Sequence, residues 1–113
     1  YVYGIDSYGE LRCLELITGN RIWESMELVP FGRWANVHLV RQEGKVWGFN
    51  EIGELSLGVL FPMGYQSKGR LKVIEPVKIS PNPRNGVTWA HPAFSGNRIY
   101  LRSDRELICI SVH

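Results

Sequence analysis

Cysteine is scarce and long apolar runs are missing from this 113-residue sequence. Two cysteines exclude a disulfide-rich scaffold and a zinc site made of cysteines alone. No apolar run approaches the roughly 20 residues that a helix needs to span a bilayer, so we expect no membrane span. An excess of one charge is also missing: 13 Lys and Arg residues stand against 11 Asp and Glu residues. The resulting net charge of +2 gives no pull toward nucleic acid.

The sequence begins at Tyr1, without a Met and without a segment that looks like a secretion signal. We therefore expect it to be a piece of a longer protein. Its length suits one domain rather than two. A content of 44% apolar and 21% charged residues is typical of a folded chain. These quantities exclude several classes of protein and identify no activity.

Helical periodicity is absent as well, because no stretch keeps apolar residues at helical spacing for three turns without Gly, Pro or a β-branched run. Short apolar runs instead alternate with turn residues, which predicts an all-β fold. The expected strands are 2–6, 10–17, 21–28, 35–41, 45–50, 54–61, 70–75, 88–95, 98–102 and 106–112. Residues 64–69 are expected as a loop, and residues 76–86, with three prolines, as the longest irregular connection.

The strongest signal is an internal repeat, which occurs at residues 2–14, 46–58 and 99–110. Each copy has a β-branched residue, an aromatic residue and a short polar residue at a turn, and then Glu-Leu opening a second strand. The repeated glutamates are 44 and 52 residues apart. A second repeat supports the first, since Trp34-Ala35-Asn36 precedes the middle copy and Trp89-Ala90-His91 precedes the last.

The first spacing matches the blade of a β-propeller, a four-stranded antiparallel meander of about 40–50 residues. We predict a single partial propeller domain of about two and a half four-stranded blades over residues 1–113. Residues 1–30 are an incomplete first blade, 33–79 a complete blade and 87–113 an incomplete last blade. A ring needs four to eight blades, so either the rest of the ring is missing or several copies of the chain build it. The two cut faces would carry apolar surface, which predicts self-association.

The segment from Cys13 to Trp23 resembles the signature of PQQ-like, or quinoprotein-type, β-propeller repeats. That signature reads small–x–acidic–x–x–Thr–Gly–basic–x–x–Trp. Cys13 stands at the small position, Asn20 replaces the basic residue, and the matching residues are Glu15, Thr18, Gly19 and Trp23. The resemblance implies that this Trp packs between adjacent blades and that the Thr-Gly turn joins the third and fourth strands. Residues 61–65 of the middle blade keep only a turn glycine.

Residues 33–112 are similar to the C-terminal part of large PQQ-like repeat proteins of planctomycete-type bacteria. The resemblance also extends to the propeller of the outer-membrane protein assembly lipoprotein. It implies a non-enzymatic binding or scaffold module of a larger periplasmic or otherwise extracytoplasmic protein. Such a module presents blade loops and edges to protein or peptide partners. Two alternatives stay open: a fragment of a quinone-dependent dehydrogenase, and a carbohydrate-binding domain.

Catalytic, cofactor and metal sites are not indicated. The family's dehydrogenases need a calcium-like ion, a catalytic Asp and usually an adjacent cysteine pair. Cys13 and Cys109 are instead 96 residues apart at equivalent repeat positions, so we expect two small buried core residues and no bridge. No calcium loop or phosphate-binding glycine loop occurs. Acidic residues at strand ends and turns are expected to be solvated: Asp6, Glu10, Glu54, Asp104 and Glu106.

His38 and His91 are expected to be hydrogen-bonded structural residues, with lining of a central channel as the alternative. Tryptophans are expected to pack between blades. The exception is Trp34 with Trp89, which together with Arg33 and His91 are possible ligand contacts at a channel rim, for a peptide or a sugar. A loose basic stretch is expected to form a solvated sheet edge: Lys68, Arg70, Lys72 and Lys78.

Overall fold

The computed structural model describes residues 1–77 and 86–112, and over these ranges the chain is built from strands without a helix. The strands are β1 (Val2–Ile5), β2 (Leu11–Leu14), β3 (Arg21–Ser25), β4 (Val37–Gln42), β5 (Lys45–Asn50), β6 (Glu54–Phe61), β7 (Gly64–Lys72), β8 (Ala93–Ser95), β9 (Arg98–Arg102) and β10 (Leu107–Ser111). The all-β prediction is confirmed. No helix in these ranges is long and apolar enough to cross a membrane.

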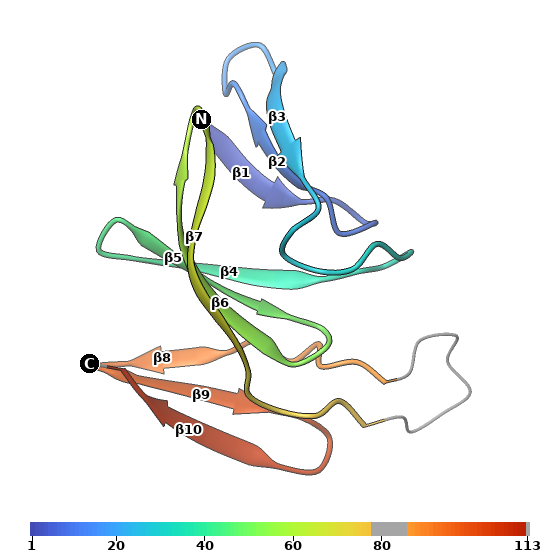
Figure 1. Ribbon diagram of the computed structural model, residues 1–113, viewed down its shortest axis with the longest axis vertical. Coiled ribbons are helices and arrows are strands. Elements are labelled where there is room, and N and C mark those ends of the chain that lie inside the picture. The colour runs from blue at the N-terminus through green and yellow to red at the C-terminus, as the bar shows by residue number, and fades with distance from the viewer. Residues whose placement is uncertain (78–85, 113) are drawn as a thin grey trace.

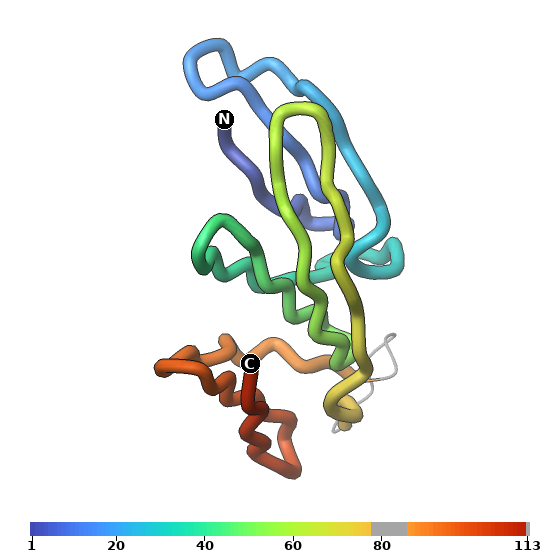
Figure 2. Tube along the Cα trace, turned by 60° about the vertical axis from the view of Figure 1, so that its left-hand side comes forward, coloured from blue at the N-terminus to red at the C-terminus, as the bar shows by residue number. Residues whose placement is uncertain are grey.

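The strands form three antiparallel sheets in chain order (Figure 1). The first sheet is β1-β2-β3, the middle sheet is β4-β5-β6-β7 and the third sheet has the order β10-β9-β8. The middle sheet lies between the other two in both views (Figures 1 and 2). Each sheet is a meander, because every hydrogen-bonded neighbour is also the next strand along the chain.

Two apolar cores hold the sheets together. Leu11 of the first sheet packs with Val37 of the middle sheet and with Leu28 and Val29 of the connection. Phe49 and Leu55 of the middle sheet form a second core with Ile74, Ile99 and Leu101. A sheet that buries one face must find a covering layer, and here each sheet covers its neighbour.

The internal repeat is visible in the strand register. Three residue pairs lie directly opposite each other in the first, middle and third sheets: Tyr3 with Cys13, Trp47 with Leu57, and Tyr100 with Cys109. The aromatic residue and its partner therefore hold one position in all three sheets.

The short polar residue of the repeat closes the turn before the second strand. The Asp6 side chain accepts hydrogen bonds from the backbone N–H groups of Tyr8 and Glu10, at 2.9 and 2.8 Å. Asn50 accepts from the backbone of Ile52 and Glu54 in the same way, at 3.2 and 2.9 Å. In the shorter third turn, the Ser103 hydroxyl accepts from Arg105 and Glu106. Such side-chain acceptors stabilise turns, which explains why the repeat has Asp, Asn or Ser here.

Two expected segments differ from the structure. Residues 64–69 were expected as a loop but belong to β7, which pairs with β6 along its whole length. β7 is an edge strand whose side chains are mostly exposed, so it shows no apolar alternation. The strand expected at 88–95 is reduced to Ala93–Ser95, because Thr88 instead bonds to the backbone of Asn50 and Glu51.

The predicted basic edge is present in part. Lys68, Arg70 and Lys72 lie on the exposed strand β7 at the edge of the middle sheet. Lys78 lies outside the described residues, as does most of the proline-rich connection expected at 76–86.

The two cysteines differ in environment, although both are free. Cys13 is fully buried, as expected. Cys109 is exposed, so the expectation of a buried core residue was wrong there. Its face of the third sheet has no covering layer among the described residues.

The signature residues form one hairpin and one contact between sheets. Glu15, Thr18 and Gly19 make the tight turn between β2 and β3, where Gly19 has φ 73°. Thr18 Oγ1 accepts from the backbone N–H of Asn20 at 3.1 Å. Trp23 packs against the core between the first and middle sheets, and its Nε1 donates to the carbonyl of Phe61 at 3.1 Å.

Candidate functional site

Trp34 and Trp89 line one shallow hollow of about 700 Å³ that is wide open to solvent, together with Ile5, Asp6, Ser7, Ala35 and Asn36. The hollow is formed by the turn after β1, the segment before β4 and the segment before β8. Both indole rings remain accessible, with exposed fractions of 61% and 47%. Trp34 and Trp89 hold equivalent positions of the repeat, before the middle and the third sheet. They therefore line the same part of the surface.

Trp34 has an unusual backbone conformation, with φ 68°. This left-handed region is unfavourable for a bulky residue. Neighbouring hydrogen bonds hold it: the Trp34 N–H donates to the carbonyl of Ser7 at 2.6 Å, and the Ala35 N–H donates to that of Gly32 at 3.0 Å. The Arg33 guanidinium lies 5.1 Å from the centre of the Trp34 ring, a cation–π distance.

Trp89 is held from two sides. Its carbonyl lies 3.0 Å from Nε2 of His38 on β4. Its indole N–H makes a long contact of 3.5 Å with Oε1 of Glu51. The same oxygen accepts the backbone N–H of Asn36 at 2.9 Å. Glu51 is thus a buried carboxylate that fastens the segments of both tryptophans to the turn after β5.

His91 lies beside the hollow and does not line it. Its ring packs on that of His38, with centroids 4.0 Å apart. Burial lowers the pKa of His38, the hydrogen bond with the Trp89 carbonyl acts in the opposite direction, and the neighbouring His91 lowers it further. His38 is a hydrogen-bonded residue between the middle and third sheets, consistent with the structural interpretation.

Polar groups complete the lining of the hollow. Both oxygens of Asp6 are engaged, Oδ1 by two backbone N–H groups and Oδ2 by Arg12 at 2.8 Å. Partial burial alone would raise the pKa of Asp6, but the N–H groups of Glu10 and Tyr8 and the Arg12 charge outweigh it and lower the pKa. The Asn36 carboxamide and the Ser7 hydroxyl have no hydrogen-bond partner among the described residues.

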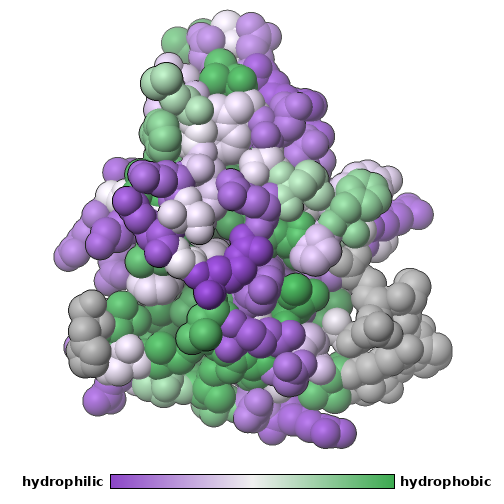
Figure 3. Space-filling model, in the orientation of Figure 1, coloured by the Kyte–Doolittle hydropathy of each residue, from purple (hydrophilic) through white to green (hydrophobic). Residues whose placement is uncertain are grey.

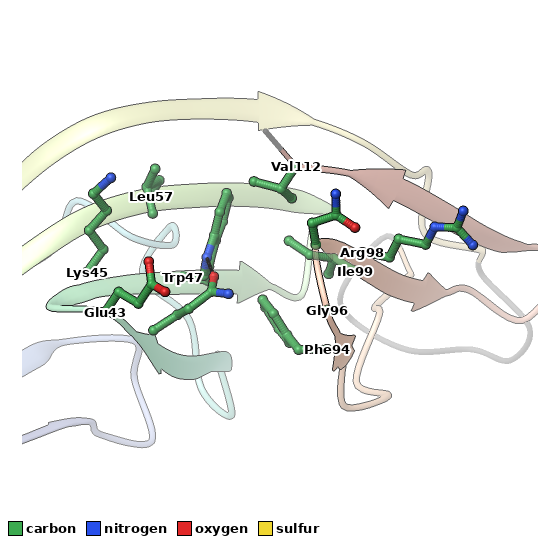
Figure 4. A pocket seen from close by; sticks show the side chains of 11 residues that line it. Glu43, Lys45, Trp47, Leu57, Phe94, Gly96, Arg98, Ile99 and Val112 are labelled. Carbon is green, nitrogen blue, oxygen red and sulfur yellow. Dashed lines mark hydrogen bonds between the residues drawn. The ribbon is translucent and has the colours of Figure 1, made fainter.

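A second cleft, of about 340 Å³, lies between the middle and third sheets (Figure 4). Trp47 of β5 and Phe94 of β8 lie on its two sides, with ring centroids 6.3 Å apart. Leu57, Ile99 and Val112 also line it, and Ile99 and Val112 belong to or adjoin the core that joins the two sheets. This cleft is a gap in the packing between sheets.

One sheet face is left open. Leu11, Leu55 and Leu107 hold the same repeat position, opposite Ile5, Phe49 and Arg102 in their sheets. Leu11 is 0% exposed and Leu55 7%, because the following sheet covers each of them. Leu107 is 71% exposed. On the side seen in Figure 3, hydrophobic surface also gathers in the lower part, where Figure 1 places the third sheet.

No group of three or more His, Cys, Asp or Glu side chains within the described ranges is placed to hold a metal ion. Comparison with protein-family models, with curated proteins and with solved structures finds no match to this chain.

The sequence predicted Arg33, Trp34, Trp89 and His91 as ligand contacts at one rim; the structure places the two tryptophans around one hollow, Arg33 against the Trp34 ring and His91 outside the lining. The sequence analysis overlooked Glu51. Glu51 follows the polar turn residue Asn50, at the position that Ser7 holds in the first copy of the repeat. The sequence signal that could have identified Glu51 is this acidic residue at a repeat position that carries Ser in the first copy. The importance of Glu51 depends on burial between the segments of Asn36 and Trp89, which lie 15 and 38 residues from it along the chain, and the sequence does not reveal this.

Proposed function

We propose that the chain is a non-enzymatic binding and scaffold module of a larger extracytoplasmic protein of the PQQ-like repeat type. It would present sheet faces, loops and edges to protein or peptide partners. The extracytoplasmic location rests on the sequence resemblance.

The observation that carries the proposal is the open face of the third sheet. Leu107 and Cys109 are exposed there, whereas Leu11 and Cys13, their counterparts in the first sheet, are completely buried. Apolar positions of this kind mark interaction surfaces when they remain uncovered. Within the chain, the first sheet packs against the middle sheet and the middle sheet against the third. These two contacts indicate that another antiparallel sheet of the same repeat would cover the open face. In a solution of this chain, that sheet belongs to a second copy.

The first sheet offers a matching face. Val2, Val46 and Ile99 are equivalent in the three copies of the repeat, opposite Leu14, Gly58 and Ile110. Val46 is 7% exposed and Ile99 1%, but Val2 is 42% exposed. Contact between the third sheet of one copy and the first sheet of another would be head-to-tail, so it would close into a ring or extend into a chain of copies.

The test is the solution mass of the protein, measured by light scattering after size exclusion over a range of concentrations. We expect masses above the monomer that rise with concentration, and we expect Leu107→Lys to shift them toward the monomer. Ile17→Lys is the matched control, because Ile17 is 92% exposed in the β2–β3 turn. A wild-type chain that stays monomeric and binds no hydrophobic dye would contradict the proposal. So would association that is unaffected by Leu107→Lys.

A further inference from the structure

We propose that the hollow between Trp34 and Trp89 binds a neutral saccharide, with a pyranose ring stacked on an exposed indole. The inference rests on the geometry of the hollow and is independent of the open sheet faces.

The first argument is the conformation of Trp34. A residue with positive φ and a large side chain is held by its surroundings at a cost, and burial of the ring would help to offset that cost. The Trp34 ring is instead 61% exposed. Backbone hydrogen bonds to Ser7 and Gly32 fix the residue in a position that displays the ring. Strain of this kind is concentrated at binding and active sites.

The second argument is that both rings are held before a ligand arrives. Trp34 is fixed by its backbone and by Arg33. Trp89 is fixed by His38 and Glu51. A ligand that stacks on rings already in place loses little conformational entropy on binding. Aromatic side chains present a flat apolar surface, which the C–H face of a sugar ring can cover.

The third argument concerns charge and hydrogen bonding. The Asp6 carboxylate is paired with Arg12 and two backbone N–H groups. The Arg33 guanidinium lies against the Trp34 ring. Arg33 keeps its charge there but does not line the hollow, and the lining side chains without a partner among the described residues are neutral: the Asn36 carboxamide and the Ser7 hydroxyl. An apolar lining with a few neutral polar groups fits a ring that carries hydroxyls at its edge.

The backbone around the hollow argues against a peptide added as a strand. The carbonyl of Ser7 accepts from Trp34, the carbonyl of Asn36 accepts from Glu51, and the carbonyl of Trp89 faces His38. The N–H groups of Ala35 and Asn36 are bonded as well. Strand addition needs free main-chain groups, so recognition here depends on side chains and favours stacking.

The test is a titration of the ¹⁵N-labelled chain with four neutral tetrasaccharides, namely cellotetraose, chitotetraose, maltotetraose and mannotetraose. The indole N–H signals of Trp34 and Trp89 report on the hollow. We expect at least one of these sugars to shift both signals in a saturable manner. A decamer of proline, which also stacks on exposed aromatic rings, serves as the peptide probe.

Variants assign the binding to the hollow. Trp34→Gly removes the ring and keeps the backbone, because glycine accepts the positive φ. Trp34→Gly and Trp89→Ala should each lower the affinity about tenfold or more, the effect of losing one aromatic contact. Phe31→Ala is the matched control, since Phe31 is 73% exposed, stacks on Tyr8 and does not line the hollow. It should leave the affinity unchanged.

Three results would overturn the inference. The first is that none of the four sugars shifts the indole signals. The second is a shift that persists at full affinity in both tryptophan variants, which would place the binding elsewhere. The third is a shift with the proline decamer while all four sugars fail, which would make the hollow a peptide site. The dispersion of the remaining amide signals shows in each case that the variant is folded.

Discussion

At the scale of single residues, positive φ angles occur in the hairpin between β4 and β5 and, at a bulky side chain, in the β-turn that contains Trp34. Glu43 and Gly44 have φ 50° and 78° in the hairpin between β4 and β5. That geometry matches the strand twist of a two-residue hairpin. Trp34 is the third residue of the β-turn 32–35, which the Ala35 N–H closes on the Gly32 carbonyl, and its φ of 68° is a value that such turns usually give to glycine or asparagine.

The strain at Trp34 can be measured by comparing two substitutions. Trp34→Gly and Trp34→Ala both remove the ring and its contact with Arg33, but only alanine keeps a Cβ at positive φ. We expect the glycine variant to be the more stable by about 1 kcal/mol, the reverse of the usual order of these residues within regular structure. Urea unfolding of the two variants gives the difference. Equal stabilities, or a more stable alanine variant, would mean that the backbone at this position is unstrained.

Gly53 is required for a different reason, which is close approach. It has φ 87°, and a Cβ built there would overlap the backbone carbonyl of Ile74. Its own carbonyl accepts from the N–H groups of Val73 and Ile74, at 2.9 and 3.3 Å. This contact ties the chain that leaves β7 to the turn between β5 and β6.

Gly53→Ala should therefore lower the free energy of unfolding by about 3 kcal/mol or more. Gly44→Ala is the control, because Gly44 also has a positive φ, of 78°, but its Cβ would meet nothing within 4 Å. That variant should lose only about 1 kcal/mol. Equilibrium unfolding in urea distinguishes the two, and similar losses would show that conformation, not contact with Ile74, decides both.

At the scale of elements, the alternation of apolar and polar residues and the residue types at turns predicted where the strands lie. Each of the ten expected strands has a counterpart, since inward apolar residues such as Leu55 alternate with polar ones and turns carry Asp, Asn, Ser or Gly. β7 was missed over 64–69 because an exposed edge strand needs no alternation. The short β8 was overestimated, because residues such as Thr88 resemble strand residues but are used in contacts with another sheet.

Substitution of Glu51 tests how the segments before β4 and β8 are held to the turn after β5. Its Oε1 accepts from the N–H of Asn36, before β4, and contacts the indole of Trp89, before β8. Glu51→Ala would leave the half-buried Asn36 N–H without its acceptor, so we expect a loss of about 2 kcal/mol. Glu51→Gln keeps an acceptor oxygen and should lose less. Urea unfolding measures both, and hydrogen exchange at Asn36 should accelerate more in the alanine variant. Equal exchange in the two variants would contradict this role.

At the scale of the whole molecule, stacking of the three sheets brings together residues that are far apart in the sequence. The hollow combines the end of the first sheet's β1, the start of the middle sheet's β4 and a segment before β8. The repeat predicted that Trp34 and Trp89 hold equivalent positions. That both line one hollow follows from the arrangement of three sheets, which depends on packing of residues such as Val29 and Ile74 in the connections between them.

The junction between the middle and third sheets should make stability depend on pH. His38 faces the Trp89 carbonyl and the ring of His91, and its pKa in the folded chain is lowered below the ordinary value of 6.5. As the pH falls through 6.5, the unfolded chain takes up a proton on His38 before the folded chain does, so the free energy of unfolding decreases. Asp6, whose pKa is lowered from 3.8, acts in a separate and more acidic range.

His38→Gln isolates this contribution, because the glutamine amide can still donate to the Trp89 carbonyl but does not titrate. We expect the wild-type chain to lose stability more steeply than the variant as the pH is lowered from 7 through the ordinary pKa of a histidine, about 6.5. Above pH 7 the two dependences should run parallel, since His38 is neutral in both folded and unfolded chains. Urea unfolding at a series of pH values gives the comparison. Parallel curves across the acidic range would show that His38 binds its proton equally well in both states, and that contact with His91 and Trp89 does not oppose its charge.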